Sequence, residues 1–197
     1  MKKLYAVWLT LMLLVPLPGW SQWTFGLSGS YTLPSGQRFS AVNREYASAT
    51  LSLLNRQFCH WWYGVRFDYG FLQRKPNLDS LTVSYQNAAV LSGELRWFPW
   101  LPTDIPFYVA GNLSFSDVGY TPRNVRFSQQ YVAEDEPSPS GIGFGIGIGY
   151  LLFYSSHCCD WFLDVSIRYH SYNGIWRSDA RPHLSGFGLH FGGFVKL

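Results

Sequence analysis

Apolar and polar side chains alternate along most of this chain with a period of two residues. In the segment 61–71, Trp, Tyr, Val, Phe, Tyr and Phe alternate with Trp, Gly, Arg, Asp and Gly. In the segment 141–150, five glycines alternate with Ile, Phe, Ile, Ile and Tyr. Successive side chains of a strand point to opposite faces. Each segment therefore predicts a strand with one apolar face and one face that is polar or bare.

Eight segments of this kind follow one another: 23–31, 48–53, 61–71, 89–97, 107–116, 141–150, 161–170 and 187–197. The connections alternate in length. Those after the second, fourth and sixth segments are short (55–60, 99–106 and 154–160), and the others are mostly longer (32–46, 72–85, 117–139 and 173–182). Alternating short turns and long loops are typical of outer-membrane barrels, with the turns in the periplasm. The pattern predicts an all-β, eight-stranded antiparallel up-and-down transmembrane β-barrel.

The chemistry of the two faces favours lipid outside and a polar interior. A secreted, soluble lipocalin-like barrel is the alternative, and it would turn its bulky residues inward around a ligand. Aromatic residues gather at the predicted periplasmic end, as one girdle of a membrane barrel requires: Trp23, Trp61, Trp97, Trp100, Phe107 and Trp161. We therefore predict that the chain lies in the outer membrane of a Gram-negative bacterium.

Composition and the N-terminus agree with export. Two lysines, an apolar stretch from Leu4 to Val15 and a polar segment ending near Gln22 are typical of a secretory signal peptide. We expect residues 1–22 to be removed and residues 23–197 to form one barrel domain. That domain has 13 basic and 12 acidic side chains, a near balance that argues against nucleic-acid binding.

The signal peptide, the eight alternating segments and the apolar last segment ending Phe194-Val-Lys-Leu197 resemble the small outer-membrane β-barrels typified by the OmpA transmembrane domain, OmpX and OmpW. The resemblance covers the mature chain and is one of pattern. It implies an outer-membrane barrel of eight strands. The final Leu197 departs from these barrels, which more often end in Phe or Trp.

Seven charged residues fall on the predicted inner face: Arg66, Asp68, Glu94, Arg96, Asp164, Arg168 and Lys196. Buried charges must be paired, and eight strands leave an interior that side chains can fill. We therefore predict a salt-bridged lumen in which Arg66 or Arg96 reaches Glu94 or Asp68 across the third and fourth strands. Such a lumen indicates a non-enzymatic protein with a structural or surface-interaction role. The alternatives are an ion or proton path through these charges, or a narrow OmpW-like channel for small apolar molecules.

The segment 168–174, Arg-Tyr-His-Ser-Tyr-Asn-Gly, is similar to the His-x-Ser-Asn motif of PagL-type lipid A deacylases. His170 matches that spacing, whereas Tyr172 occupies the nucleophile position and Ser171 comes one residue early. A shift of one residue turns a strand side chain to the opposite face. His170 and Ser171 are therefore weak catalytic candidates, and we expect His170 to be a lumen or loop-base residue.

Metal and partner sites have little support in the sequence. Cys59, Cys158 and Cys159 fall in predicted periplasmic turns on opposite sides of the barrel, so we expect no metal site. We also expect no bound cofactor. The expected partners are outer-membrane lipid and lipopolysaccharide, with a surface protein as a further candidate for the loops 32–46, 72–85, 117–139 and 173–182. The acidic, proline-containing end of the loop 117–139 predicts a segment without structure of its own.

Overall fold

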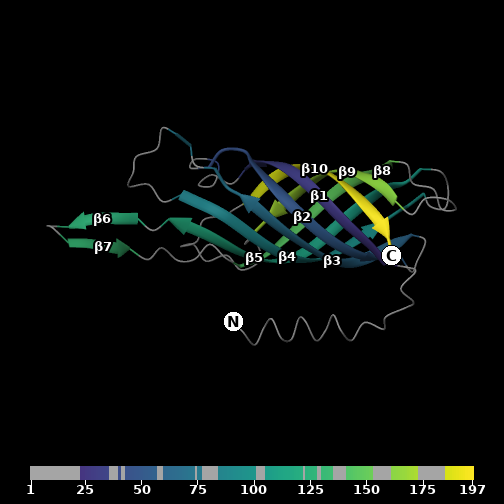
Figure 1. The fold of residues 1–197 in the computed structure, drawn as a ribbon, viewed down its shortest axis with the longest axis horizontal. Helices are drawn as coiled ribbons and strands as arrows, with labels where there is room; N and C mark the ends of the chain where they lie inside the picture. Colours follow the sequence, from purple (N-terminus) through teal and green to yellow (C-terminus); the bar gives the residue numbers. More distant parts are fainter. Residues whose placement is uncertain are drawn as a thin grey trace, which may run out of the picture.

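Eight long antiparallel strands close into one barrel (Figure 1). The computed structural model describes residues 23–35, 40, 43–56, 60–73, 75–76, 84–100, 105–121, 123–127, 130–134, 141–152, 161–172 and 185–197. The barrel strands are β1 (Trp23–Pro34), β2 (Tyr46–Asn55), β3 (Trp61–Phe71), β4 (Ser84–Trp97), β5 (Phe107–Thr121), β8 (Gly141–Leu152), β9 (Trp161–Ser171) and β10 (Ser185–Lys196). Each strand pairs with the barrel strands before and after it in the chain, and β10 closes the ring by pairing with β1. The predicted fold is confirmed.

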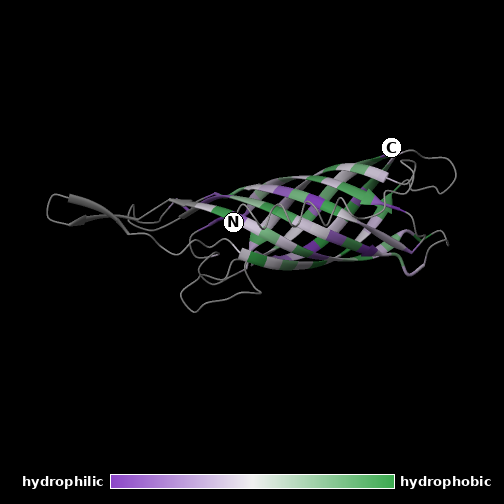
Figure 2. Cartoon of the chain, turned by 90° about the horizontal axis from the view of Figure 1, so that it is seen from below, coloured by the Kyte–Doolittle hydropathy of each residue, from purple (hydrophilic) through white to green (hydrophobic). Residues whose placement is uncertain are grey.

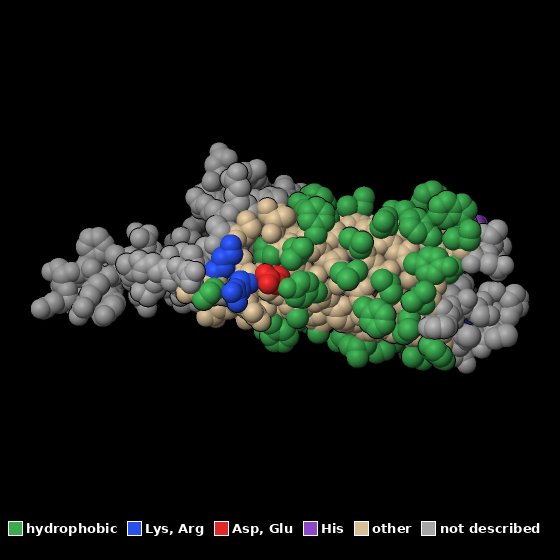
Figure 3. Space-filling view, turned by 90° about the horizontal axis from the view of Figure 1, so that it is seen from above, with side chains coloured by type: hydrophobic (Ala, Val, Ile, Leu, Met, Phe, Trp, Pro, Cys, Tyr) green, Lys and Arg blue, Asp and Glu red, His purple; other side chains and the backbone are tan. Residues whose placement is uncertain are grey.

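The two faces of the strands follow the alternation of the sequence. On β3 and β9, Phe67 and Ile167 face outward and are 40% and 56% exposed, whereas the intervening Arg66 and Arg168 are 3% exposed. Hydrophobic side chains project from the visible barrel wall along its length, and a group of charged side chains lies near one end of it (Figure 3). The green and purple positions alternate along the strands in Figure 2. The exterior is an apolar belt of the kind that lipid surrounds.

The two ends of the barrel differ. Trp23 and Leu197 are joined by a backbone hydrogen bond of 2.9 Å, so β1 begins where β10 ends, and we call this the terminal end. The connections after β2, β4 and β8 lie at the same end, and the connections after β1, β3, β5 and β9 lie at the opposite, loop end (Figure 1).

Aromatic side chains frame the apolar belt at both ends. At the terminal end, Trp61 stacks on Trp97 with ring centroids 6.0 Å apart, in the girdle that the sequence predicts. At the loop end, neighbouring outward rings also touch, including Tyr69 with Phe71 and Tyr169 with Phe187, each pair 5.0 Å apart. This second girdle was not predicted from the sequence, although its members lie on the predicted outer face. Two such girdles are the usual borders of a membrane-embedded barrel.

The loop predicted at 117–139 begins later than expected and contains two strands, whereas residues 135–139 of its acidic end lie outside the described residues. β5 continues to Thr121, and two further strands, β6 (Arg123–Phe127) and β7 (Gln130–Glu134), pair with each other as a separate antiparallel ribbon. β1 and β4 are also longer than predicted at the loop end. Backbone pairing satisfies N–H and C=O groups whatever the side chains are. A strand can therefore continue after the alternation of its side chains has ended.

The predicted signal peptide, residues 1–22, lies outside the described residues, as do all three cysteines. The signal peptide stays a prediction. Among the described residues, no helix is both long and apolar enough to cross a membrane.

Candidate functional site in the barrel interior

The terminal end of the lumen is filled by a cluster of buried apolar side chains, which we call the aromatic plug. Its members come from six barrel strands and one turn: Leu54, Trp62, Phe98, Tyr108, Ala110, Leu151, Phe162 and Phe194. The rings of Phe162 and Phe194 stack at 5.1 Å, and Phe98 lies 4.5 Å from Trp62. Arg56, which follows β2, places its guanidinium 4.7 Å from the centre of the Trp62 ring. The plug therefore has a cation at its edge, where a cation–π contact is favourable.

Next to the plug, in the middle of the lumen, Glu94 on β4 accepts hydrogen bonds from two arginines. Arg96 Nε donates over 2.6 Å, and Arg168 Nη1 donates over 2.8 Å from β9, on the other side of the lumen. Arg66 Nη1 adds an ion pair at 3.6 Å. All four residues are at most 3% exposed. Such a carboxylate is stable in a buried site because its charge is compensated and its oxygens are hydrogen-bonded.

Asp164 and Tyr108 join this network to the aromatic plug. Asp164 on β9 accepts from Arg96 Nη1 at 2.8 Å and from the Tyr108 hydroxyl at 2.6 Å. The Tyr108 ring lies 4.6 Å from the Arg96 guanidinium carbon and packs in the plug through Phe98. β9 is separated from β5 by one strand and from β4 by two. These contacts therefore span the lumen and occupy its interior.

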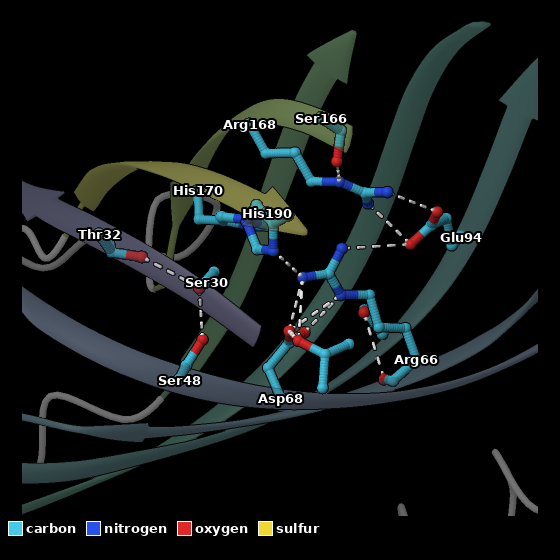
Figure 4. A network of polar contacts seen from close by, with 12 residues as sticks. Ser30, Thr32, Ser48, Arg66, Asp68, Glu94, Ser166, Arg168, His170 and His190 are labelled. Atoms are coloured by element: carbon cyan, nitrogen blue, oxygen red, sulfur yellow. Dashed lines mark hydrogen bonds and ion pairs between the residues drawn. The ribbon is translucent and has the colours of Figure 1, made fainter. Parts of the chain in front are cut away.

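On the loop side of Glu94, Arg66 forms the second half of the network (Figure 4). Its guanidinium donates to both carboxylate oxygens of Asp68, the shortest bond being 2.6 Å, and also lies 3.0 Å from Nδ1 of His190. Thr50 donates to Asp68 over 2.5 Å. An arginine is only a donor, so Nδ1 of His190 must be the unprotonated acceptor and Nε2 must carry the proton.

That tautomer explains the contact between the two histidines. His170 Nε2 and His190 Nε2 lie 3.4 Å apart. Because His190 Nε2 is the protonated nitrogen, it is the donor and His170 Nε2 is the acceptor. A metal ion between these two nitrogens would require His190 to lose that proton while Arg66 remains bound to Nδ1. Among the described residues, no three metal-ligating side chains come together.

The loop end of the lumen holds a small polar chamber. Its volume is about 20 Å³, and its walls are Ser30, Thr32, Ser48, Asp68, Gly70, Ala88, Val90, His170, Tyr172 and His190. This is room for one or two water molecules. The Tyr172 hydroxyl is hydrogen-bonded to the Tyr46 hydroxyl, and the Tyr172 carbonyl accepts from Ser116 over 2.6 Å. Tyr172, the residue that follows β9, is therefore turned inward against the chamber.

The glycine run of β8 makes room for these inner side chains. A Cβ atom at Gly149 would lie 2.3 Å from Cζ of Tyr108, and one at Gly147 would lie 2.6 Å from Cγ of Arg168. Both distances are too short for real contacts. The bare face predicted from the sequence is thus covered by Tyr108 and Arg168. Both side chains belong to the buried ion pairs and hydrogen bonds around Glu94, Asp164 and Asp68, which we call the charge network.

Six of the seven predicted inner charges lie in the lumen. Three are basic (Arg66, Arg96 and Arg168) and three are acidic (Asp68, Glu94 and Asp164). The prediction that the seventh, Lys196, lies in the lumen was wrong. Lys196 is exposed at the terminal end, where β10 ends. Sequence reasoning missed Phe98 and Arg56, which come after strands end and carry no alternation signal. His190, which joins the network through Arg66, was not among its predicted members.

The described residues of the deacylase-like motif, 168–172, lie at the end of β9 and directly after it, and His170 is partly buried there. His170 contacts His190 and stacks near Tyr172, whose ring centre is 6.4 Å away. Ser171 is 1% exposed and Tyr172 is 8% exposed, so alternation of exposure stops here. The hydroxyl of Tyr172, at the nucleophile position of the motif, is engaged by Tyr46.

Comparisons with solved structures give the same fold. The chain is similar to Neisserial surface protein A, with a TM-score of 0.61, 12% identity, and coverage of 89% of this chain and 97% of that one. It is also similar to the attachment invasion locus protein Ail of Yersinia pestis, solved with the heparin analogue sucrose octasulfate (TM-score 0.51, 8% identity, 88% and 97% covered). A third is the outer membrane protein OprG of Pseudomonas aeruginosa (TM-score 0.50, 11% identity, 90% and 96% covered).

No protein-family model matches the chain, and no curated protein matches it significantly in sequence. At these identities the structural likeness concerns the fold. Together with the apolar belt and its two aromatic girdles, the fold is that of a small integral protein of the outer membrane.

Proposed function

We propose that this protein is a non-enzymatic outer-membrane barrel with a closed lumen, which acts in the structure of the membrane or in interactions at the cell surface. The observation that most strongly supports this proposal is the set of ion pairs that join β4 to β9 through Glu94 and Asp164. These pairs lie beside the aromatic plug, so two consecutive layers of side chains occupy the lumen. An eight-stranded barrel has little interior space beyond such layers.

A surface role has support from two of the similar structures. One is called a surface protein, and the other is called an attachment invasion locus protein. In the present chain the connections after β1, β3, β5 and β9 all lie at the loop end, and the connection after β5 includes the ribbon of β6 and β7. This end is where a partner outside the cell would meet the protein.

The main alternative is a narrow channel for ions or small apolar molecules. The polar chamber extends only part of the way through the barrel, and its floor is formed by Asp68 and the two histidines. Below this floor, Arg66, Glu94 and Arg168 are joined across the lumen. A channel would require these ion pairs and the plug beyond them to rearrange together.

The second alternative is hydrolysis of lipid A. A nucleophile acting on a lipid must reach the outer apolar surface, and a general base must lie within about 3 Å of it. His170 points instead into the lumen toward His190, and Ser171 is buried. This geometry favours a structural role for the motif.

The proposal is tested with purified protein in lipid vesicles. We expect vesicles containing the barrel to swell no faster in small sugars than empty vesicles, and we expect no fatty acid to be released from lipopolysaccharide. Swelling that depends on the barrel would favour a channel. Fatty acid release that disappears in both His170→Ala and Ser171→Ala, with the barrel still folded, would favour the enzyme.

A further inference from the structure

A small group of surface charges lies at the loop end, beyond the apolar belt. At this end Arg44 and Glu45, just before β2, are exposed and Lys75, after β3, is half-exposed; Asp117 on β5 is a further exposed charge. Figure 3 shows basic and acidic side chains close together near one end of the barrel, next to hydrophobic side chains. Arg44 and Lys75 flank adjacent strands, because Arg44 precedes β2 and Lys75 follows β3.

Backbone contacts hold the two cations near each other. The Arg44 N–H donates to the carbonyl of Gln73 over 2.8 Å, and the side-chain amide of Asn43 donates to the same carbonyl over 3.3 Å. Lys75 is two residues further along that segment. Within the described part of the chain, no ion pair engages Arg44 or Lys75. Both cations are directed to the outside, unlike the arginines of the lumen.

The height of the group relative to the membrane follows from the strand register. Ala47 is paired with Tyr31 and Phe71, which are 52% and 58% exposed in the loop-end girdle. Arg44 precedes Ala47 by three residues, or about 10 Å of extended chain. With a strand tilt of about 40°, that is roughly 8 Å along the membrane normal. The polar headgroup region beyond the hydrocarbon is about 5–8 Å thick on each side, so Arg44 lies at headgroup level.

We propose that Arg44 and Lys75 bind a phosphate group of lipid A, the phosphorylated glycolipid of the outer leaflet, whose acyl chains then lie against the apolar belt below. Arginine and lysine are the side chains that bind phosphate, and the belt with its girdle continues directly beneath them. Glu45, whose carboxylate contacts the Tyr31 hydroxyl, opposes an anion at this position. The proposal rests on the outer-membrane orientation with the loop end outward.

The test measures binding of lipid A to the purified full-length mature barrel in detergent by native mass spectrometry. Arg44→Gln and Lys75→Gln should each weaken binding about fivefold, in line with the known contribution of a basic residue near an anionic membrane surface. Lys196→Gln, which removes an exposed cation from the opposite end, should bind as the wild type does. Glu45→Gln should bind more tightly. Dephosphorylated lipid A should bind weakly to every variant.

Equal binding by the wild type and by the Arg44→Gln, Lys75→Gln double variant would overturn the proposal. So would equal binding of lipid A with and without its phosphates, because contacts with acyl chains would then account for the whole affinity. A preference for a soluble sulfated oligosaccharide over lipid A would show that the surface recognises glycans instead. Vesicle swelling and fatty acid release are measured separately, so failure of the lumen proposal is distinguishable from failure of this one.

Discussion

The aromatic plug and the charge network fill adjacent parts of one lumen by opposite means. In the plug, Phe162 and Phe194 are held by ring packing, which depends on volume and shape. In the network, Glu94 is held by the positions of three particular arginines. Packing tolerates a partner of similar size, whereas a buried charge without its partner is strongly destabilising. The stability of the network therefore depends mainly on the identity of each residue, whereas the stability of the plug depends mainly on the size of each side chain.

The largest expected effect comes from removing the charge at the centre of the network. Glu94→Gln keeps the size of the side chain but leaves three buried arginines with two carboxylates. We expect the free energy of unfolding to fall by about 4 kcal/mol, since breaking a buried pair from one side has costs of this order. Urea unfolding of the refolded barrel in lipid vesicles measures the change. The control Glu45→Gln, at an exposed carboxylate, should change it by less than about 0.5 kcal/mol; a loss below about 1 kcal/mol for Glu94→Gln would contradict the assigned role of its charge.

The next effect comes from opening a cavity in the plug. Phe162→Ala removes a ring that contacts Trp62 and Phe194, and we expect a loss of about 3 kcal/mol in the same assay. Phe191→Ala is the matched change on the outer face, where the ring is 57% exposed. It should cost less, because lipid chains can occupy the space. Equal losses for the two variants would show that the plug is loosely packed.

A smaller effect is expected at the boundary between the two layers, beneath Tyr108. A methyl group at Gly149 would meet the Tyr108 ring, whereas a methyl group at Gly111 would have no heavy atom within 4 Å. We expect Gly149→Ala to destabilise the barrel by about 1–3 kcal/mol through overpacking. Gly111→Ala should be neutral or slightly stabilising, because glycine weakens a strand. If both substitutions had the same effect, the glycine run would not be explained by the space that Tyr108 needs.

The smallest effect is expected at the edge of the network. Thr50→Val removes a hydroxyl that donates to Asp68 but leaves the Arg66 bond to that carboxylate intact. We expect a loss of about 1 kcal/mol, the typical contribution of one hydrogen bond. Thr50→Ser keeps the hydroxyl and should retain most of the stability. If Thr50→Val lowered the free energy of unfolding as much as Glu94→Gln, this peripheral hydrogen bond would contribute as much stability as the central charge, contrary to our expectation.

Much of the fold could be predicted because a membrane barrel has a two-residue repeat that appears directly in its sequence. The repeat predicted which side of β3 and β9 faces lipid, and hence the inward position of Arg66 and Arg168. The expected ion pair across the third and fourth strands is present as Arg66 with Glu94, at 3.6 Å. The shorter pair of Arg96 with Glu94 lies along β4 itself and was not predicted.

Contacts across the lumen could not be predicted in the same way. The pairing of Arg168 with Glu94 depends on the tilt and stagger of strands that are not neighbours. Phe98 and Arg56 follow the ends of strands, where no repeat says which way a side chain points. Lys196 was wrongly predicted to lie inside for a related reason. It stands at the end of β10, where the barrel wall ends and alternation no longer places a side chain in the lumen.

The central claim is that the two layers close the lumen, and single-channel recording tests it most directly. Purified mature barrel is inserted into a planar lipid bilayer, and current is recorded at fixed voltage in symmetric salt. The account predicts no steady open state above the baseline of the protein-free bilayer. A resolved and reproducible conductance of the wild-type protein would contradict it, because ions would then pass through a region that Glu94, Arg168 and the aromatic plug are described as filling.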